Sequence, residues 1–117
     1  MTPYIFVGIP ELPQHQFRLG ATITAPNDII DCACHVLNVN RTDVLSKSRK
    51  RELVECRQIA IGLIRINSQS TLKNIGKMFN RDHSTIIYAC ENFKDLYGVD
   101  KQFTKKVNLV KQKTNNL

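Results

Sequence analysis

The stretch Ser-Thr-Leu-Lys-Asn-Ile-Gly-Lys-Met-Phe-Asn-Arg-Asp-His-Ser-Thr-Ile-Ile, residues 70–87, decides the fold. Serine and threonine at its start can cap a helix, and apolar residues recur from Leu72 to Phe79 at the spacing of one helical face. Asn80 can adopt the left-handed conformation that ends such a helix. Asp82 can cap the next helix. Two helices joined by a short turn form a helix-turn-helix pattern.

Helical patterns continue on both sides of this pair. The expected helices span residues 27–39, 42–45, 52–67, 72–79, 82–97 and 100–113, the first capped by Asn27 or Asp28. The third is apolar nearly all round from Ile59 to Ile66, so it should be the most buried element. The sequence therefore predicts an all-α fold, a small helical bundle that contains a helix-turn-helix.

The first 26 residues have a different composition. They contain all four prolines and two of the five glycines, which favours an irregular arm over a helix. We therefore divide the chain into an N-terminal arm, residues 1–26, and a helix-turn-helix domain, residues 27–117. With 117 residues, the chain can bury one small core. No apolar run is long enough to span a membrane or to form a signal peptide, and we expect a cytoplasmic protein.

Positive charge is gathered in patches. The chain has 17 Lys and Arg against 10 Asp and Glu, for a net charge of +7, which favours a polyanionic partner such as nucleic acid. Residues 41–57 have a net charge of +3, and residues 66–81 hold three cations and no acid. These two patches come before residues 82–85 in the chain, and residues 101–117 add five lysines.

The segment Asn80-Arg81-Asp82-His83-Ser84-Thr85 has the chemistry to read base edges. Asp82 can cap the helix that it opens, which leaves the positive end of the helix dipole facing outward. His83 and Ser84 can each donate and accept hydrogen bonds with bases. The alternative is a solvated helix cap with no ligand. The flanking basic patches favour contact with DNA.

These residues also carry a family resemblance. Residues from about 28 to 110 resemble the C-terminal DNA-binding domain of the bacterial replication initiator DnaA, domain IV, which has a Trp-repressor-like helix-turn-helix. The matching segments are Asp43-Val44-Leu45-Ser46-Lys47, Arg57-Gln58-Ile59-Ala60-Ile61, Leu72-Lys73-Asn74-Ile75-Gly76 and Arg81-Asp82-His83-Ser84-Thr85-Ile86. The last is close to the family signature Arg-Asp-His-(Ser/Thr)-Thr-Val. The resemblance implies binding of double-stranded DNA at a DnaA box.

The resemblance also implies roles for individual residues. Asp82, His83 and Ser84 would face bases, and Thr85 would contact bases or phosphate. Arg49, in the basic loop, would enter the minor groove, where narrow A·T-rich sequence attracts arginine. The residues that would contact phosphate or backbone, or lie beside such contacts, are Lys47, Lys50, Arg51, Arg57, Leu72 (through its amide), Lys73, Lys77 and Arg81.

Three departures from the family pattern stand out. Glu55-Cys56 replaces a common Arg-Pro, and Asn80 replaces Gly-Gly, which shortens the turn by one residue. The chain also lacks a Gly-x-x-x-x-Gly-Lys-(Ser/Thr) phosphate loop and has no room for an ATPase domain. We therefore expect a stand-alone relative of domain IV, of the kind that a phage or a mobile element would carry.

The four cysteines raise two further alternatives. Cys32, Cys34, His35 and Cys90 contain metal-ligand types, but a Cys-x-Cys-His run on a helix points its side chains in different directions. The second alternative is a nucleophilic Cys–His pair, but nothing else in the sequence indicates a substrate cleft. We expect reduced thiols packed in the core, no cofactor, no metal and no enzyme activity.

The sequence thus predicts a monomeric or weakly associating protein of the bacterial nucleoid. It would bind a DnaA-box-like site and regulate replication initiation or transcription by occupying it. The rival from another class is an adaptor whose residues 1–26 bind a replication protein, with DNA binding secondary.

Overall fold

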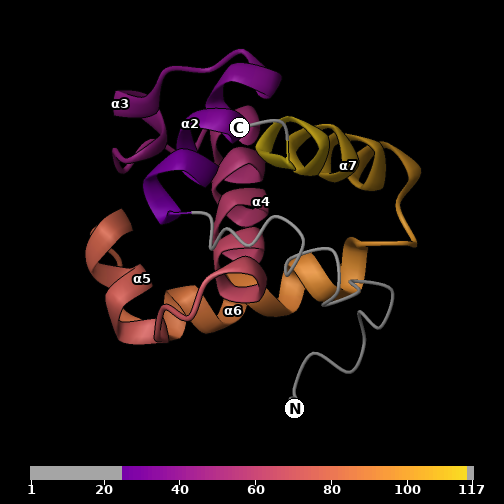
Figure 1. Ribbon diagram of the computed structural model, residues 1–117. Helices are drawn as coiled ribbons and strands as arrows, with labels where there is room; N and C mark the ends of the chain where they lie inside the picture. The colour runs from indigo at the N-terminus through magenta and orange to yellow at the C-terminus, as the bar shows by residue number, and fades with distance from the viewer. Residues whose placement is uncertain (1–24, 116–117) are drawn as a thin grey trace.

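The long helix α4 (Arg51–Asn67) forms the centre of the fold, and the other helices pack around it. The computed structural model of the protein describes residues 25–115 (Figure 1). The other helices are α2 (Pro26–Leu37), α3 (Arg41–Val44), α5 (Leu72–Phe79), α6 (His83–Leu96) and α7 (Lys101–Asn115). These described residues contain no strand, and the all-α prediction is confirmed. The predicted arm falls almost wholly outside them.

Helix α4 is buried on nearly every side. It contacts α2, α3, α5 and α6, and its residues Ile59, Leu63 and Ile64 have no more than 1% of their surface exposed. A helix that packs against neighbours on several faces needs apolar residues all round, which is the pattern read between Ile59 and Ile66. The prediction that this helix is the central element is confirmed.

Helices α5 and α6 form the predicted helix-turn-helix. Thr71 caps α5 by accepting a hydrogen bond from the backbone amide of Asn74 at 3.1 Å. Ile75 and Phe79 from α5 and Ile86 from α6 are fully buried in the shared core. Their burial fixes which faces of the two helices turn toward α4.

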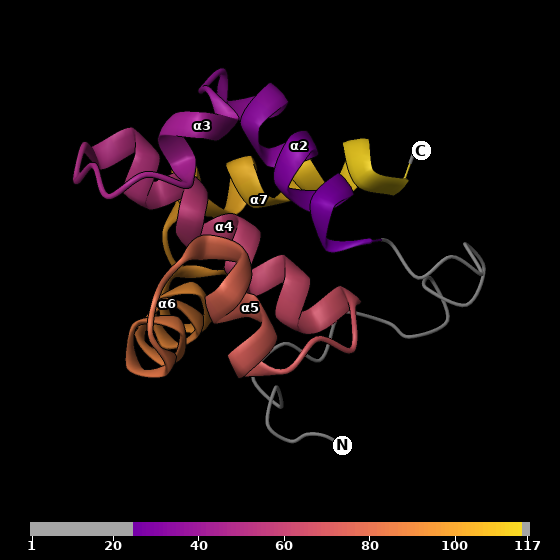
Figure 2. The same cartoon turned by 90° about the vertical axis from the view of Figure 1, so that its left-hand side faces the viewer.

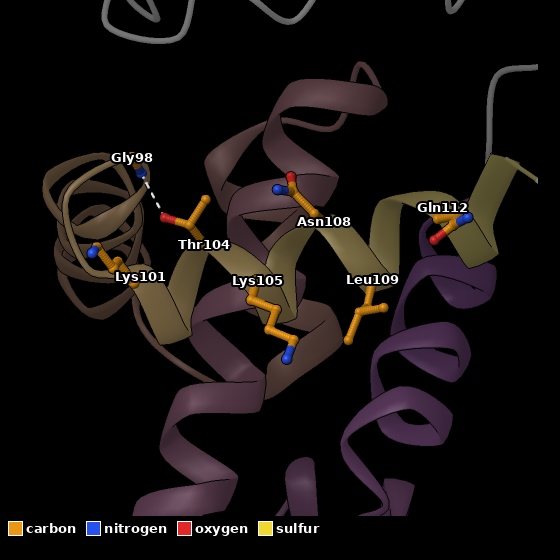
Figure 3. Close-up of a pocket in the computed structure, with 7 residues that line it drawn as sticks. All are labelled: Gly98, Lys101, Thr104, Lys105, Asn108, Leu109 and Gln112. Carbon is orange, nitrogen blue, oxygen red and sulfur yellow. Dashed lines mark hydrogen bonds between the residues drawn. The ribbon is translucent and has the colours of Figure 1, made fainter.

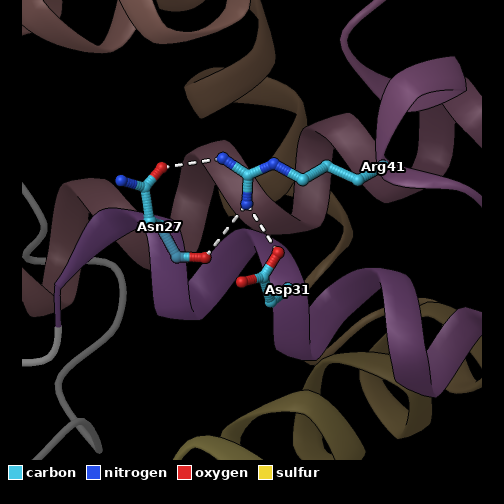
Figure 4. A network of polar contacts seen from close by, with 3 residues as sticks. All are labelled: Asn27, Asp31 and Arg41. Carbon is cyan, nitrogen blue, oxygen red and sulfur yellow. Dashed lines mark hydrogen bonds and ion pairs between the residues drawn. The ribbon is translucent and has the colours of Figure 1, made fainter.

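The start of α2 differs from the prediction. The helix begins at Pro26 with Ala25 at the capping position, and neither Asn27 nor Asp28 caps it. Proline is well suited to the first turn because the amide that it lacks would have no helical partner there. The Asn27 side chain instead accepts a 2.8 Å hydrogen bond from Arg41, whose guanidinium also pairs with Asp31 at 2.6 Å (Figure 4).

Helix α7 lies on the opposite side of α4 from α5 in both views (Figures 1 and 2). It packs on α2 and buries Phe103, Val107 and Val110, as predicted. Glu55, at a family position that commonly holds arginine, pairs with Lys106 of α7 at 2.7 Å. The acidic residue at this position therefore forms an ion pair between two helices of the fold.

Candidate nucleic-acid interface

The turn between α5 and α6 is tight because its residues permit close backbone approach. Asn80 has φ 54° and ψ 48°, the left-handed conformation predicted for it. The Arg81 amide then donates to the carbonyl of Gly76 at 2.9 Å. A Cβ on Gly76 would lie 2.7 Å from the Arg81 carbonyl oxygen, so only glycine fits here without a shift. One residue, Asn80, thus suffices to turn the chain into the next helix.

Asp82 caps α6, as predicted. Its Oδ1 accepts a 2.9 Å hydrogen bond from the Thr85 amide. Hydrogen bonding from the backbone of Thr85, and then from its side chain, lowers the pKa of the Asp82 carboxyl. An exposed carboxylate is able to accept a hydrogen bond from a base amino group, such as that of cytosine.

The first turn of α6 is presented to solvent. Asp82, His83, Ser84 and Thr85 are all exposed, so the structure brings together the four residues predicted to face bases. Tyr88, one helical turn beyond Ser84, is 63% exposed and extends the same strip. We did not predict a role for Tyr88, although its spacing of four from Ser84 was visible in the sequence.

Gly62 of α4 sets how closely α6 approaches the core. A Cβ at this position would lie 2.3 Å from the Phe93 ring of α6, so the ring packs against bare backbone. The ring also stacks on Tyr97 with centroids 5.7 Å apart and meets Phe103 edge-on at 5.8 Å. Local sequence spacing does not indicate this role of Gly62, because Phe93 lies 31 residues away in the chain.

The basic loop, residues 45–50, is shaped by its serines. The Ser46 hydroxyl donates to the carbonyl of Asp43 and accepts from the Ser48 amide, and the Ser48 hydroxyl accepts from the Lys50 amide. In these bonds the serine hydroxyls pair with backbone groups a few residues away in the loop. The predicted DNA contacts Lys47, Arg49, Lys50 and Arg51 are exposed.

Arg57 has a different environment from the loop cations. Only 7% of its surface is exposed, and its Nε donates to the Val44 carbonyl at 2.6 Å. Its Nη2 donates to the Ser46 carbonyl at 2.9 Å. Burial, and then the charge of Arg81, lower the pKa of its guanidinium. Arg57 thus anchors the basic loop to α4, and its predicted phosphate contact stays a prediction.

Arg81 joins the loop to the helix-turn-helix. Its Nη2 donates to the same Ser46 carbonyl at 2.6 Å, and its Nη1 donates to the Phe79 carbonyl at 2.8 Å. Residues 35 positions apart are therefore in direct contact. This bond places the basic loop beside the start of α6 (Figure 2). No local pattern in the chain indicates this contact.

The exposed face of α5 completes the basic surface. Lys73 and Lys77 are exposed, and Leu72 is half-buried at the first position of the helix. A hollow of about 370 Å³ separates this face from the start of α6, lined in part by Lys73, Lys77, Arg81 and His83. The helix start, the α5 lysines and the basic loop form one positively charged surface.

The candidate metal-ligand residues do not gather at one point. Cys32, Cys34 and Cys56 are buried, whereas His35 is exposed, so the Cys-x-Cys-His run does not converge. Within residues 25–115 no three His, Cys, Asp or Glu side chains gather as a metal site would require. Nor does any helix in this range have the length and apolar character to cross a bilayer.

A second hollow lies on α7, away from this surface (Figure 3). It has a volume of about 400 Å³ and is lined by Lys101, Thr104, Lys105 and Leu109, among others. Thr104 accepts a 2.8 Å hydrogen bond from the Gly98 amide at its rim.

Comparisons with known proteins agree with this geometry. The family model described as "Bacterial dnaA protein helix-turn-helix" matches residues 26–92. The chromosomal replication initiator protein DnaA of Bacteroides fragilis is 37% identical over 78 residues, which cover 66% of this chain and 16% of that protein. The same protein of Synechococcus sp. is 30% identical over 111 residues, covering 87% and 24%. That of Mesorhizobium japonicum is 31% identical over 110 residues, covering 92% and 22%. This chain thus spans a quarter or less of the length of these relatives.

Proposed function

Because the chain belongs to the bacterial DnaA helix-turn-helix family, whose domain binds DNA without catalysis, we propose that it recognises a DnaA-box-like sequence in double-stranded DNA. The observation that carries the proposal is the single surface formed by the start of α6 and the basic loop, joined by the 2.6 Å bond from Arg81 to Ser46. A base-reading helix and a basic loop on one surface can engage adjacent grooves of one duplex.

The start of α6 supplies the base-reading groups. His83 and Ser84 are exposed on its first turn, where a helix entering the major groove contacts base edges. Asp82 accepts with its exposed carboxylate, and Thr85 adds a hydroxyl and a methyl group. The positive helix terminus and Arg81 offset the cost of bringing the Asp82 carboxylate near DNA.

The basic residues supply affinity. Arg49, exposed in the loop, enters the narrow minor groove beside the site read by α6. Lys73 and Lys77 neutralise phosphates along one side of the major groove, and Lys47, Lys50 and Arg51 lie next to the backbone. By occupying such a site on the bacterial chromosome, the protein regulates the start of replication or of transcription.

Binding of labelled duplexes tests the proposal. Fluorescence anisotropy at moderate salt compares a DnaA-box duplex with a scrambled duplex of the same composition. We expect the box duplex to bind more tightly by about 4 kcal/mol or more, the lower end of typical specific recognition. Equal affinity for the two duplexes would reject sequence-specific recognition.

Variants separate reading of bases from contact with phosphate. His83→Ala should cost about 1–3 kcal/mol on the box duplex alone, and Lys73→Ala should weaken binding to both duplexes about equally. Lys101→Ala is the control, because Lys101 is an exposed cation on α7, away from the surface. Equal losses on both duplexes for His83→Ala would show that His83 reads no base.

A further inference from the structure

We propose that Arg81 is a positioning residue that holds the basic loop and the start of α6 in a fixed relation, so that both engage DNA together. The inference rests on the proposed function and deepens it. It departs from the role predicted from sequence, in which Arg81 itself neutralises a phosphate.

The contacts of Arg81 point inward. Both terminal nitrogens of its guanidinium donate to backbone carbonyls, Nη1 to Phe79 at 2.8 Å and Nη2 to Ser46 at 2.6 Å. The residue is half-buried, whereas Asp82 and His83 beside it are exposed. A planar guanidinium can bridge two carbonyls in this way because its donors lie in a fixed fork. Phe79 ends α5, so the fork joins the helix-turn-helix to the loop.

The carbonyl of Ser46 receives two arginines. Arg57 of α4 donates to it at 2.9 Å, so its two lone pairs serve the core helix and the helix-turn-helix at once. The Ser46 hydroxyl in turn accepts from the Ser48 amide at 3.2 Å. Arg49 follows directly in the chain. The path of the basic loop is therefore set at Ser46.

The two arginines are held together against their mutual repulsion. No carboxylate within residues 25–115 forms an ion pair with either guanidinium, and the charge of Arg81 helps to lower the pKa of Arg57. Two buried or half-buried cations that share one carbonyl, with no anion beside them, lower the stability of the fold. The hydrogen bonds that both guanidinium groups donate to the Ser46 carbonyl hold the two cations in place.

A fixed relation between the two groups has a measurable consequence. When a loop and a helix must enter neighbouring grooves together, the second contact is made at an effective concentration set by the connection between them. If Arg81 no longer holds the loop, Arg49 loses this gain in effective concentration, although no phosphate contact is lost. The effects of changing Arg81 and Arg49 should therefore be strongly coupled.

A double-mutant cycle tests this coupling on the box duplex. We expect Arg81→Ala to weaken binding about tenfold or more, and to weaken it by about threefold or less when Arg49 is already alanine. The salt dependence of binding should keep its slope. Equal losses in both backgrounds, with a slope reduced by about one, would identify Arg81 as a phosphate contact and overturn the proposal.

Arg81→Lys distinguishes geometry from charge. It keeps the positive charge, but a single ammonium cannot bridge two carbonyls as the fork does. Positioning predicts that Arg81→Lys behaves like Arg81→Ala, whereas a phosphate contact predicts near-normal binding. Lys77→Ala is the matched control: it removes an exposed cation of α5 and should weaken box and scrambled duplexes alike.

Hydrogen exchange of the free protein tests the link without DNA. In folded Arg81→Lys, the amides of Ser48 and Lys50 should exchange faster, because the loop loses its second anchor. Unchanged exchange there would overturn the proposal, and so would loss of the whole fold in both Arg81 variants. If the wild-type protein shows no preference for the box duplex, the proposed function fails, while the exchange measurement still decides whether Arg81 positions the loop.

Discussion

At the scale of single residues, Asp82 caps α6, and we propose that the same carboxylate also contacts a base. Its Oδ1 accepts from the Thr85 amide at 2.9 Å, and the side chain is exposed toward solvent. A cap that also faces DNA cannot be replaced by any side chain that fulfils only one of these roles.

The lowered pKa of Asp82 predicts a pH dependence of stability. Because its pKa in the folded state is below the unfolded value of about 3.9, its contribution is fully present above that value and is lost as the pH falls through the folded pKa. Asp82→Asn can still cap the helix but does not titrate there. The Tm difference between wild type and Asp82→Asn should therefore shrink below about pH 4.

Thermal unfolding between pH 7 and pH 3, followed by circular dichroism, measures this difference. Glu91→Gln, an exposed change on the same helix, is the control and should show a smaller change in its Tm difference. A constant Tm difference for Asp82→Asn across the range would contradict the stabilising role of the charged form.

At the scale of elements, two asparagines end helices in the same unusual conformation. Asn38 ends α2 at φ 57°, and Asn80 ends α5 at φ 54°. Asparagine tolerates this left-handed region better than other non-glycine residues. Only Asn80 lies in the turn that orients α6, so the pair offers a matched comparison within one chain.

Changing each asparagine to alanine separates stability from function. Both Asn38→Ala and Asn80→Ala should destabilise the fold by about 1–2 kcal/mol, because Cβ strain is no longer offset by local hydrogen bonding. Only Asn80→Ala should also weaken binding to the box duplex. Urea denaturation and anisotropy measure the two quantities. Equal loss of DNA affinity in both variants would mean that the Asn80 turn has no special role in orienting α6.

The packing of α6 on α4 gives a second prediction at this scale. Gly62→Ala should destabilise the protein by about 1–3 kcal/mol, because the new methyl group overlaps the Phe93 ring. In a Phe93→Ala background, where the space is open, the same change should cost much less. Urea denaturation of the four proteins measures the coupling, and additive costs would show that Phe93 is not the obstacle.

At the scale of the whole molecule, charge is divided between two sides of α4. The loop cations and the lysines of α5 lie with the start of α6, while Lys101 and Lys105 lie on α7 on the opposite side (Figure 1). One duplex cannot contact both sides of a domain of this size at once. The proposed DNA surface therefore uses only some of the 17 lysine and arginine residues of the chain.

The salt dependence of binding follows from this division. About four to six phosphate contacts should give a slope of roughly −4 to −5 in log affinity against log salt concentration. Lys73→Ala should reduce its magnitude by about one, and Lys105→Ala should leave it unchanged. Anisotropy titrations at several salt concentrations measure the slopes. A matching reduction for Lys105→Ala would place DNA against α7 as well.

Most helix positions could be read from the sequence because they depend on neighbours in the chain. Apolar spacing located α4 and α7, and the caps Thr71 and Asp82 marked the starts of α5 and α6 to within a residue. The same local logic failed at α2. There, Pro26 starts the helix, and Asn27 is bound by Arg41, 14 residues away.

The sequence by itself determined the helices, the exposed segment from Asp82 to Thr85 and the family. The tertiary structure alone decided that Arg57 is buried, that the Phe93 ring rests on Gly62, and that Arg81 and Arg57 meet at the carbonyl of Ser46. The physical reason is distance along the chain. Capping and periodicity act within a few residues, whereas a carbonyl shared by two arginines exists only once α4 and the α5–α6 turn have packed together.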